Sequence, residues 1–224
     1  MNQPRVSLRR IRINRPPALA LIAAAGLALV ATSAVAAPES FAIDPAHSAV
    51  GFTIRHLFSR VPGRFTRFEG KMVLDREDYS KSSVQVAIDA TSIDTNEPAR
   101  DKHLRSDAFF DVAKHPKITF ESTSVKQVAP NKLQVAGNLT IRGTTKPVTL
   151  DAEVLGFGPG YGGGFRGGFE AHTKINRQDF GVAWNDVVEG GGAVLGDEVD
   201  ISINVEAAKE QPKPAASPAP KKGA

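Results

Sequence analysis

Five histidines and two groups of arginines are the residues of this chain whose side chains could do chemistry. Imidazole is a common metal ligand, and structural zinc sites pair ligands a few positions apart in the sequence. No two histidines have such a spacing, and the chain has no cysteine to complete a ligand set. The sequence therefore predicts no metal site, and we expect hydrogen bonds to backbone groups or carboxylates at His47, His56, His103, His115 and His172.

The basic residues Arg100, His103 and Arg105 lie close together in the sequence, and Arg55 and His56 form a second basic pair. If the fold gathers these side chains at one opening, they could bind a diphosphate through charge-assisted hydrogen bonds, or a quinone carbonyl. Such a cationic mouth is one of two interpretations that the sequence leaves open.

The other interpretation is structural, because arginine and aspartate side chains often fix a loop through paired contacts. Arg177 and Asp179 have the spacing of such a pair, and Asp94 and Asp101 are the internal partners that the sequence offers to the arginines. The sequence favours neither interpretation.

No catalytic site is predicted, because the chain has no G-x-S-x-G element and no local pairing of a nucleophile with a base. Residues 156–168 read GFGPGYGGGFRGG and could offer backbone amides to a phosphate. They lack the G-K-[ST] ending and the strand-to-helix setting of phosphate loops, so we interpret them as a mobile hairpin loop.

The first 36 residues have the pattern of a secretory signal peptide. Basic residues between Arg5 and Arg15 precede an apolar run from Ala18 to Val30, and Ala34-Val35-Ala36 offers a cleavage site. An uncleaved membrane anchor is the alternative. We expect export to the periplasm, followed by one domain over residues 38–208 and a disordered Pro-, Ala- and Lys-rich tail over residues 209–224.

The net charge of +4 does not describe the predicted domain, because the positive charge lies at the two ends of the chain. The leader has five arginines and no acidic residue, so the chain without it has a net charge of −1. The tail has an excess of three positive charges, which leaves −4 for the body. A mildly acidic body excludes binding to a nucleic-acid backbone as the expected function.

Alternation of apolar and polar residues predicts eight half-exposed antiparallel strands. Strict period two is clearest in Leu133-Val135-Gly137-Leu139-Ile141. Short polar turns separate the segments, as hairpins require. The predicted strands are a first one containing Val50, Phe52 and Ile54, then 61–74, 84–88, 118–125, 133–141, 147–154, 168–175 and 199–205.

One segment, Ala99 to Phe110, lacks alternation and is predicted to be a short helix, with Pro98 suited to its first turn and Phe109-Phe110 placed to plug or line an open end. The predicted fold is therefore all-β, an eight-stranded antiparallel up-and-down barrel with one short helix between strands. A two-sheet sandwich is the alternative. Space inside the barrel would come from small residues, with Gly51, Gly70, Ala87, Ala136, Gly137 and Ala171 as interior candidates.

Six sequence blocks together resemble the YceI-like family of bacterial periplasmic proteins, over nearly all of Phe41 to Ala208. They are the opening run Ile43 to Leu57, Gly63-x-Phe65-x-x-Phe68-x-Gly70, Ser92-Ile93-Asp94-Thr95, Arg100-Asp101-x-His103-Leu104-Arg105-Ser106-x-x-Phe109-Phe110, Leu139-Thr140-Ile141-Arg142-Gly143-x-x-Lys146-Pro147-Val148 and Asn176-Arg177-x-Asp179-Phe180-Gly181. The resemblance implies a lipocalin-like barrel whose elongated apolar cavity holds a polyprenyl phosphate or an isoprenoid quinone. It also implies a binding protein that is not an enzyme. The glycine-rich segment 156–168 departs from the family pattern.

We therefore predict an exported, non-catalytic carrier without a cofactor, whose ligand is an isoprenoid lipid. Transient contact with a membrane surface and dimerisation through exposed barrel ends are compatible with this function. The alternatives are a hydrolase or transferase that acts on a lipid head group with His103 or His47 as acid or base, and a ligand-free barrel that binds proteins. The predicted ligand-binding residues are Phe52, Ile54, Phe58, Phe65, Arg100, His103, Leu104, Phe109, Phe110, Phe120, Phe169, Phe180 and Trp184.

Overall fold

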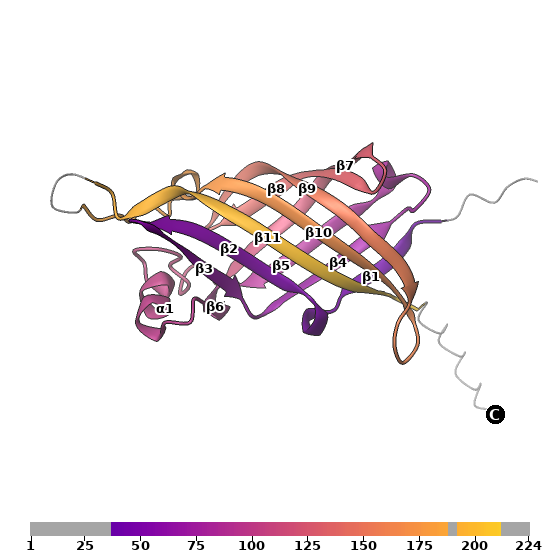
Figure 1. Ribbon diagram of the computed structural model, residues 1–224, viewed down its shortest axis with the longest axis horizontal. Coiled ribbons are helices and arrows are strands. Elements are labelled where there is room, and N and C mark those ends of the chain that lie inside the picture. Colours follow the sequence, from indigo (N-terminus) through magenta and orange to yellow (C-terminus); the bar gives the residue numbers. More distant parts are fainter. Residues whose placement is uncertain (1–36, 188–191, 212–224) are drawn as a thin grey trace, which may run out of the picture. The chain divides into compact units, whose positions relative to one another are not determined.

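Figure 1 shows the computed structural model of the chain, which describes residues 37–187 and 192–211. The predicted signal peptide and residues 212–224 of the predicted tail lie outside the described residues. The strands are β1 (Glu39–Ile43), β2 (Ala49–His56), β3 (Ser59–Phe65), β4 (Phe68–Leu74), β5 (Ser83–Asp89), β6 (Ile93–Asp94), β7 (Lys117–Ala129), β8 (Lys132–Ile141), β9 (Thr144–Pro159), β10 (Phe165–Asn176) and β11 (Leu195–Lys209). The helix α1 spans Pro98–Arg105, and short 3₁₀ turns lie at Pro45–His47, Tyr79–Lys81, Ala90–Ser92 and Arg177–Phe180.

The strands form one closed antiparallel barrel with eight strand positions, as predicted. Three positions hold a strand that is broken in the middle: β1 with β2, β3 with β4, and β5 with β6. Each position pairs with the next one in sequence, and β11 pairs with both β1 and β2. The register Phe41↔Lys209 to Ile43↔Ala207 closes the sheet, so no edge runs the length of the barrel.

Two of the three breaks have a clear local cause. They are the break between β1 and β2, at Pro45, and the break between β5 and β6, at Ala90. Asp44 caps the 3₁₀ turn Pro45–His47 by accepting a hydrogen bond from the Ala46 backbone N–H, and Pro45 provides no N–H for the ladder. Asp89 caps the turn Ala90–Ser92 in the same way through Thr91. The chain therefore bends twice while keeping its place in the barrel wall.

Helix α1 is shorter than the predicted segment Ala99 to Phe110. Pro98 occupies the first turn as expected, and the Glu97 side chain accepts a hydrogen bond from the Ala99 N–H. The helix ends at Arg105, and the following backbone forms a series of turns that place Phe109 against the core. Helix α1 lies at one end of the barrel, whereas the β9–β10 hairpin and the ends of the described chain lie at the other (Figure 1).

The glycine-rich segment 156–168 is mostly strand, which corrects the prediction of a mobile loop. β9 continues to Pro159 and β10 begins at Phe165, so the connection is only residues 160–164. A register shift next to Gly156 (φ 149°) marks a β-bulge that leaves Leu155 58 % exposed. Glycine here serves the bulge and the tight turn, in which Gly162, Gly163 and Gly164 all have positive φ.

Six small residues were predicted to lie on the inner face of the barrel, and three of them lie on the outer face instead. Ala87 and Ala136 alternate with the inward residues Val86 and Val135. Gly51 borders the cavity, but a Cβ at this position would point to the Ser202 side chain, on the face opposite Phe52. The inward-facing ones are Gly70, Gly137 and Ala171. At the C-terminal end, β11 reaches Lys209 and thus includes the first residue of the predicted tail. Among the described residues, no helix is long and apolar enough to span a bilayer.

Candidate functional site

The inward faces of the strands surround an apolar cavity of about 580 Å³ inside the barrel. This volume falls within the range of small-molecule binding sites, roughly 300–1,000 Å³. Its wall is built from alternate strand residues, for example Val199, Ile201, Ile203 and Val205 of β11. Because a closed barrel satisfies its backbone hydrogen bonds between strands, this wall presents mainly apolar side chains to the cavity.

Twelve of the thirteen predicted ligand-binding residues line this cavity. They are Phe52, Ile54, Phe65, Arg100, His103, Leu104, Phe109, Phe110, Phe120, Phe169, Phe180 and Trp184. Phe58 is the exception, because it lies in the β2–β3 turn with its side chain fully exposed. The predicted set left out most of the aliphatic wall, although the period-two alternation of the strands marks these positions.

The end of the cavity beside α1, which we call the mouth, carries polar and aromatic side chains. His103 lines the cavity and is itself exposed, so the cavity reaches solvent here. Its ring stands edge-on to Phe109 and Trp184, with centroid distances of 4.9 and 5.0 Å. Phe109 and Trp184 are 5.1 Å apart, so the three rings form one contact at the rim.

Arg100 also lines the mouth, but its guanidinium group is held by Thr95. Its Nε donates to Thr95 Oγ1 and its Nη2 to the Thr95 carbonyl oxygen, each at 2.7 Å. The buried Asp101 carboxylate accepts hydrogen bonds from the backbone N–H and the hydroxyl of Thr95. These contacts fix α1 to Thr95, the residue after β6, so Asp101 pairs with a threonine and not with an arginine as the structural interpretation expected.

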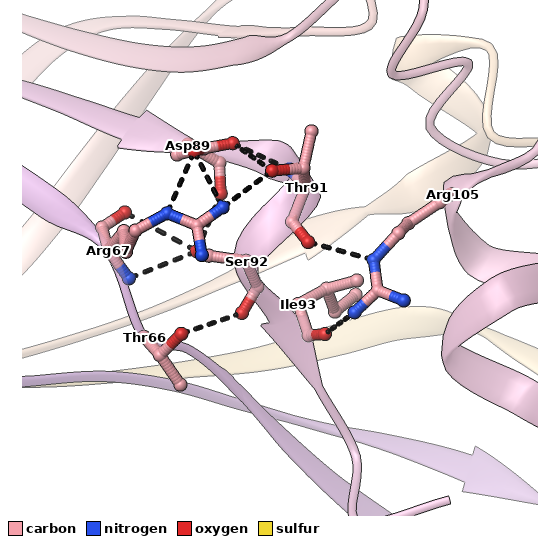
Figure 2. A network of polar contacts seen from close by, with 7 residues as sticks. All are labelled: Thr66, Arg67, Asp89, Thr91, Ser92, Ile93 and Arg105. Carbon is pink, nitrogen blue, oxygen red and sulfur yellow. Dashed lines mark hydrogen bonds and ion pairs between the residues drawn. The ribbon is translucent and has the colours of Figure 1, made fainter. Parts of the chain in front are cut away.

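Figure 2 shows how the break between β5 and β6 is secured from both sides. Arg67 donates two hydrogen bonds to Asp89 Oδ2, at 3.0 and 2.8 Å, and a third to Thr91 Oγ1 at 2.7 Å. Hydrogen bonds from Thr91, together with those from Arg67, hold the pKa of Asp89 below its ordinary value. On the other side, Arg105 of α1 donates to the carbonyl oxygens of Thr91 (2.8 Å) and Ile93 (2.7 Å).

The other basic residues expected at a cationic mouth have different positions. Arg105 is not part of the cavity wall, and Arg55 is exposed with its Nε donating to the Leu57 carbonyl oxygen. His56 does line the cavity. Asp94 pairs with Arg64 at 2.9 Å and not with a helix arginine. The mouth is therefore polar: it offers the imidazoles of His56 and His103, whereas the Arg100 guanidinium is already hydrogen-bonded to Thr95.

Arg177 is a buried arginine that holds the segment carrying Trp184. Its guanidinium donates to the carbonyl oxygens of Gly196 (2.9 Å), Val182 (2.7 Å) and Trp184 (2.7 Å). Its acidic partner is Asp197, at 3.2 Å, and not the predicted Asp179. Burial lowers the pKa of Arg177, whereas Asp197 opposes this effect. Arg177 itself lines the cavity, so this buried cation fixes one side of the mouth from within the wall.

The opposite end of the barrel is filled by aromatic rings. Phe41 is completely buried against Phe157 and Phe165, with centroid distances of 6.1 and 6.5 Å. Arg76 lies over the Phe157 and Phe165 rings, at 5.4 and 5.1 Å from their centroids, and Glu39 accepts a hydrogen bond from it. These three rings are not part of the cavity wall.

One group of possible metal ligands does form on the outside of the barrel. Side-chain ligand atoms of Asp44, His47 and Glu206 lie within 4.8 Å of one another. However, Arg166 Nη1 donates to Asp44 Oδ2 and to Glu206 Oε1, each at 2.6 Å, so a cation already bridges the carboxylates. Hydrogen bonds from Arg166 and then His47 lower the pKa of Asp44 to about 2.

Comparison with known proteins gives matches over most of the chain. Residues 41–207 match the family model of the YceI-like domain. Protein YceI of Salmonella arizonae and that of Salmonella newport are each 42% identical over 191 residues, which is 84% of this chain and 95% of theirs.

Solved structures give the same result. The YCEI protein of Campylobacter jejuni matches with a TM-score of 0.61 and 32% identity, over 75% of this chain and 96% of that one. BcnA of Burkholderia cenocepacia matches with a TM-score of 0.65 and 25% identity, over 73% and 98%.

A polyisoprenoid binding domain from Saccharophagus degradans shares the fold, with a TM-score of 0.55 over 77% of this chain and 99% of that one, at 14% identity. The barrel, its internal cavity and the match over residues 41–207 agree, and the chain belongs to the YceI-like family.

Proposed function

We propose that this chain is an exported, non-catalytic binding protein that holds a long isoprenoid amphiphile in its barrel. The observation that carries the proposal is the cavity of about 580 Å³, which has an apolar wall and a polar, solvent-reaching mouth. An apolar tail fits such a wall, because each buried CH₂ contributes about 0.8 kcal/mol. A polar head would remain at His56 and His103.

The ligand class follows from this arrangement and from the family. A polyprenyl phosphate or an isoprenoid quinone combines a long apolar chain with one polar end. The Saccharophagus degradans domain, which is described as polyisoprenoid binding, provides a precedent on the same fold. The leader predicted over residues 1–36 supports a periplasmic location.

We also propose that the mouth contacts a membrane surface for a short time when lipid enters or leaves. Phe58 supports this proposal, because it is fully exposed on the β2–β3 turn, two residues from the cavity residue His56. Aromatic side chains are favoured at membrane interfaces. A lipid could then pass between bilayer and barrel with little exposure of its chain to water.

Native mass spectrometry of the mature protein from its own host, followed by solvent extraction, tests the proposed function. A single stoichiometric isoprenoid would support it and identify the ligand. A protein that is isolated empty and takes up neither polyprenyl phosphates nor isoprenoid quinones would overturn it and favour a protein-binding barrel. Turnover of a lipid head group that is lost in a folded His103→Ala variant would instead indicate the enzyme alternative.

A further inference from the structure

Four inward-facing glycines of the barrel each lie beneath a large side chain of the neighbouring strand. If Gly63 carried a Cβ, that atom would lie 2.3 Å from Phe52 Cζ and 2.8 Å from each Phe52 Cε. The corresponding closest distances are 2.5 Å for Gly137 beneath Phe120 and 2.7 Å for Gly167 beneath Phe157. The fourth is Gly70, at 2.5 Å from Ile43 Cδ1. Carbon atoms do not approach this closely, so each neighbouring side chain occupies space that only glycine leaves free.

Gly63 differs from two of these glycines because the three atoms nearest to a Cβ there all belong to a side chain. At Gly137 and Gly70, a Cβ would also meet backbone carbonyl oxygens, at 2.6 and 2.9 Å. At Gly63 the three nearest atoms all belong to the Phe52 ring, and its φ is not positive. The Phe52 ring is therefore the first obstacle to a larger residue at position 63.

Phe52 is placed where it can narrow the cavity. It pairs with Gly63 on one side and with Ile201 of β11 on the other, and both Phe52 and Ile201 line the cavity. Along β2, His56 and Ile54 lie towards the mouth and Val50 lies deeper. The Phe52 ring lies over Gly63 of the neighbouring strand β3, and a methyl group at position 63 would displace the ring from this place.

We propose that Gly63 sets the width of the cavity by giving the Phe52 ring a place against the wall. Gly63 is then a specificity-determining residue, because it admits chains that must pass Phe52 to reach the deeper half of the cavity. The ligand class that needs this passage is a long, extended prenyl chain. This inference rests on the proposed binding of an isoprenoid amphiphile.

The test compares Gly63→Ala with the wild type, using undecaprenyl phosphate and geranyl phosphate as probes. We expect Gly63→Ala to bind undecaprenyl phosphate about tenfold more weakly, which corresponds to a loss of about 1.4 kcal/mol of binding free energy. Binding of geranyl phosphate, whose short chain fits the mouth half, should change much less. Gly158→Ala is the matched control, because a Cβ at Gly158 has no atom within 4 Å and its φ is not positive.

The double variant Gly63→Ala, Phe52→Leu distinguishes a change in cavity width from general damage to the fold. Without the ring, the added methyl group has nothing to displace, so the effect of Gly63→Ala should largely disappear in the Phe52→Leu background. An equal loss with and without the ring, or an unchanged preference between the two probes, would overturn the inference. If Gly63→Ala fails to fold alone, recovery of folding by Phe52→Leu supports the same contact, and failure to recover contradicts it.

The outcome of this test is distinct from failure of the proposed function. A wild-type protein that binds neither probe would overturn isoprenoid binding. A crystal structure of Gly63→Ala then still decides whether the ring leaves the wall. A ring that keeps its place, with the strands shifted to admit the methyl group, would overturn the role of Gly63 whatever the wild type binds.

Discussion

Trp184 stands edge-on to His103 at the mouth of the barrel, with ring centroids 5.0 Å apart and ring planes at 82°. Trp184 is the only tryptophan of the chain, and it lines the cavity. Its fluorescence therefore reports on the mouth alone. This single contact gives a direct optical measurement of ligand entry.

We expect a saturable blue shift of Trp184 emission when a polyprenyl phosphate enters, because the chain replaces water beside the indole ring. A fluorescence titration checks this prediction. His103→Ala should alter the emission of the free protein while the titration remains saturable. Emission that stays constant while mass spectrometry detects bound lipid would show that the ligand does not pass Trp184.

Arg105→Ala should destabilise the fold by about 1–3 kcal/mol, because it leaves two half-buried carbonyl oxygens without their donor. These are the oxygens of Thr91 and Ile93, which fix α1 across the break between β5 and β6. Urea denaturation measures the change in the free energy of unfolding. Arg60→Ala is the control, because it removes only an exposed ion pair with Asp200 and should change stability little. Equal effects of the two variants would contradict the assigned role of Arg105.

Asp44→Asn should weaken the dependence of thermal stability on pH at acid pH. The pKa of Asp44 in the folded protein is about 2, below its ordinary 3.8, owing first to Arg166 and then to His47. A carboxyl group with a lowered folded pKa stabilises the protein above its unfolded pKa, and this contribution is lost as the pH falls to the folded pKa.

The difference in Tm between wild type and Asp44→Asn should therefore shrink between a pH of about 4 and a pH of about 2. Circular dichroism melts across this range measure it. Glu69→Gln is a suitable control, since the Glu69 side chain is 80% exposed and lies 3.8 Å from Lys117. A constant difference across the window would contradict the prediction.

Phe58→Ser should reduce binding to lipid vesicles while stability stays within about 0.5 kcal/mol of the wild type. The Phe58 side chain is fully exposed, so its removal costs no core packing. Co-sedimentation with vesicles of phosphatidylcholine and phosphatidylglycerol measures the binding. Val128→Ser removes an exposed apolar residue in β7, beside the turn to β8, and should leave binding unchanged. An equal loss of vesicle binding in both variants would indicate non-specific hydrophobic adsorption without a specific docking site.

The strands and their inward faces could be predicted from the sequence because a half-buried strand imposes period two on its residues. Leu133, Val135, Leu139 and Ile141 all line the cavity as their alternation indicates. Phe58 shows where this reasoning fails. It has the same parity as Phe52, Ile54 and His56, but the backbone turns at Leu57 (φ 48°) and the parity is lost.

The roles of four arginines could not be predicted from the sequence, because their partners are mostly backbone carbonyl oxygens: Arg55, Arg100, Arg105 and Arg177. Every residue has a backbone carbonyl group, so no pattern of side chains predicts that Arg105 binds the carbonyl oxygens of Thr91 and Ile93. The contact of Phe52 with Gly63 was missed for a related reason. It depends on the register between two strands, which becomes visible only once β2 and β3 are paired.

The pairing of β1 with β11 has a consequence for the order in which the chain can fold. Lys209 donates a hydrogen bond to Glu39 across this pairing, 170 positions away in the chain. Contacts of such long range are slow to form, because the loop between them must be closed first. The barrel therefore cannot close before β11, its last strand, is available to pair with β1 and β2. If export occurs as proposed, a chain whose C-terminal strand has not yet crossed the membrane would keep the residues of its cavity wall open to water.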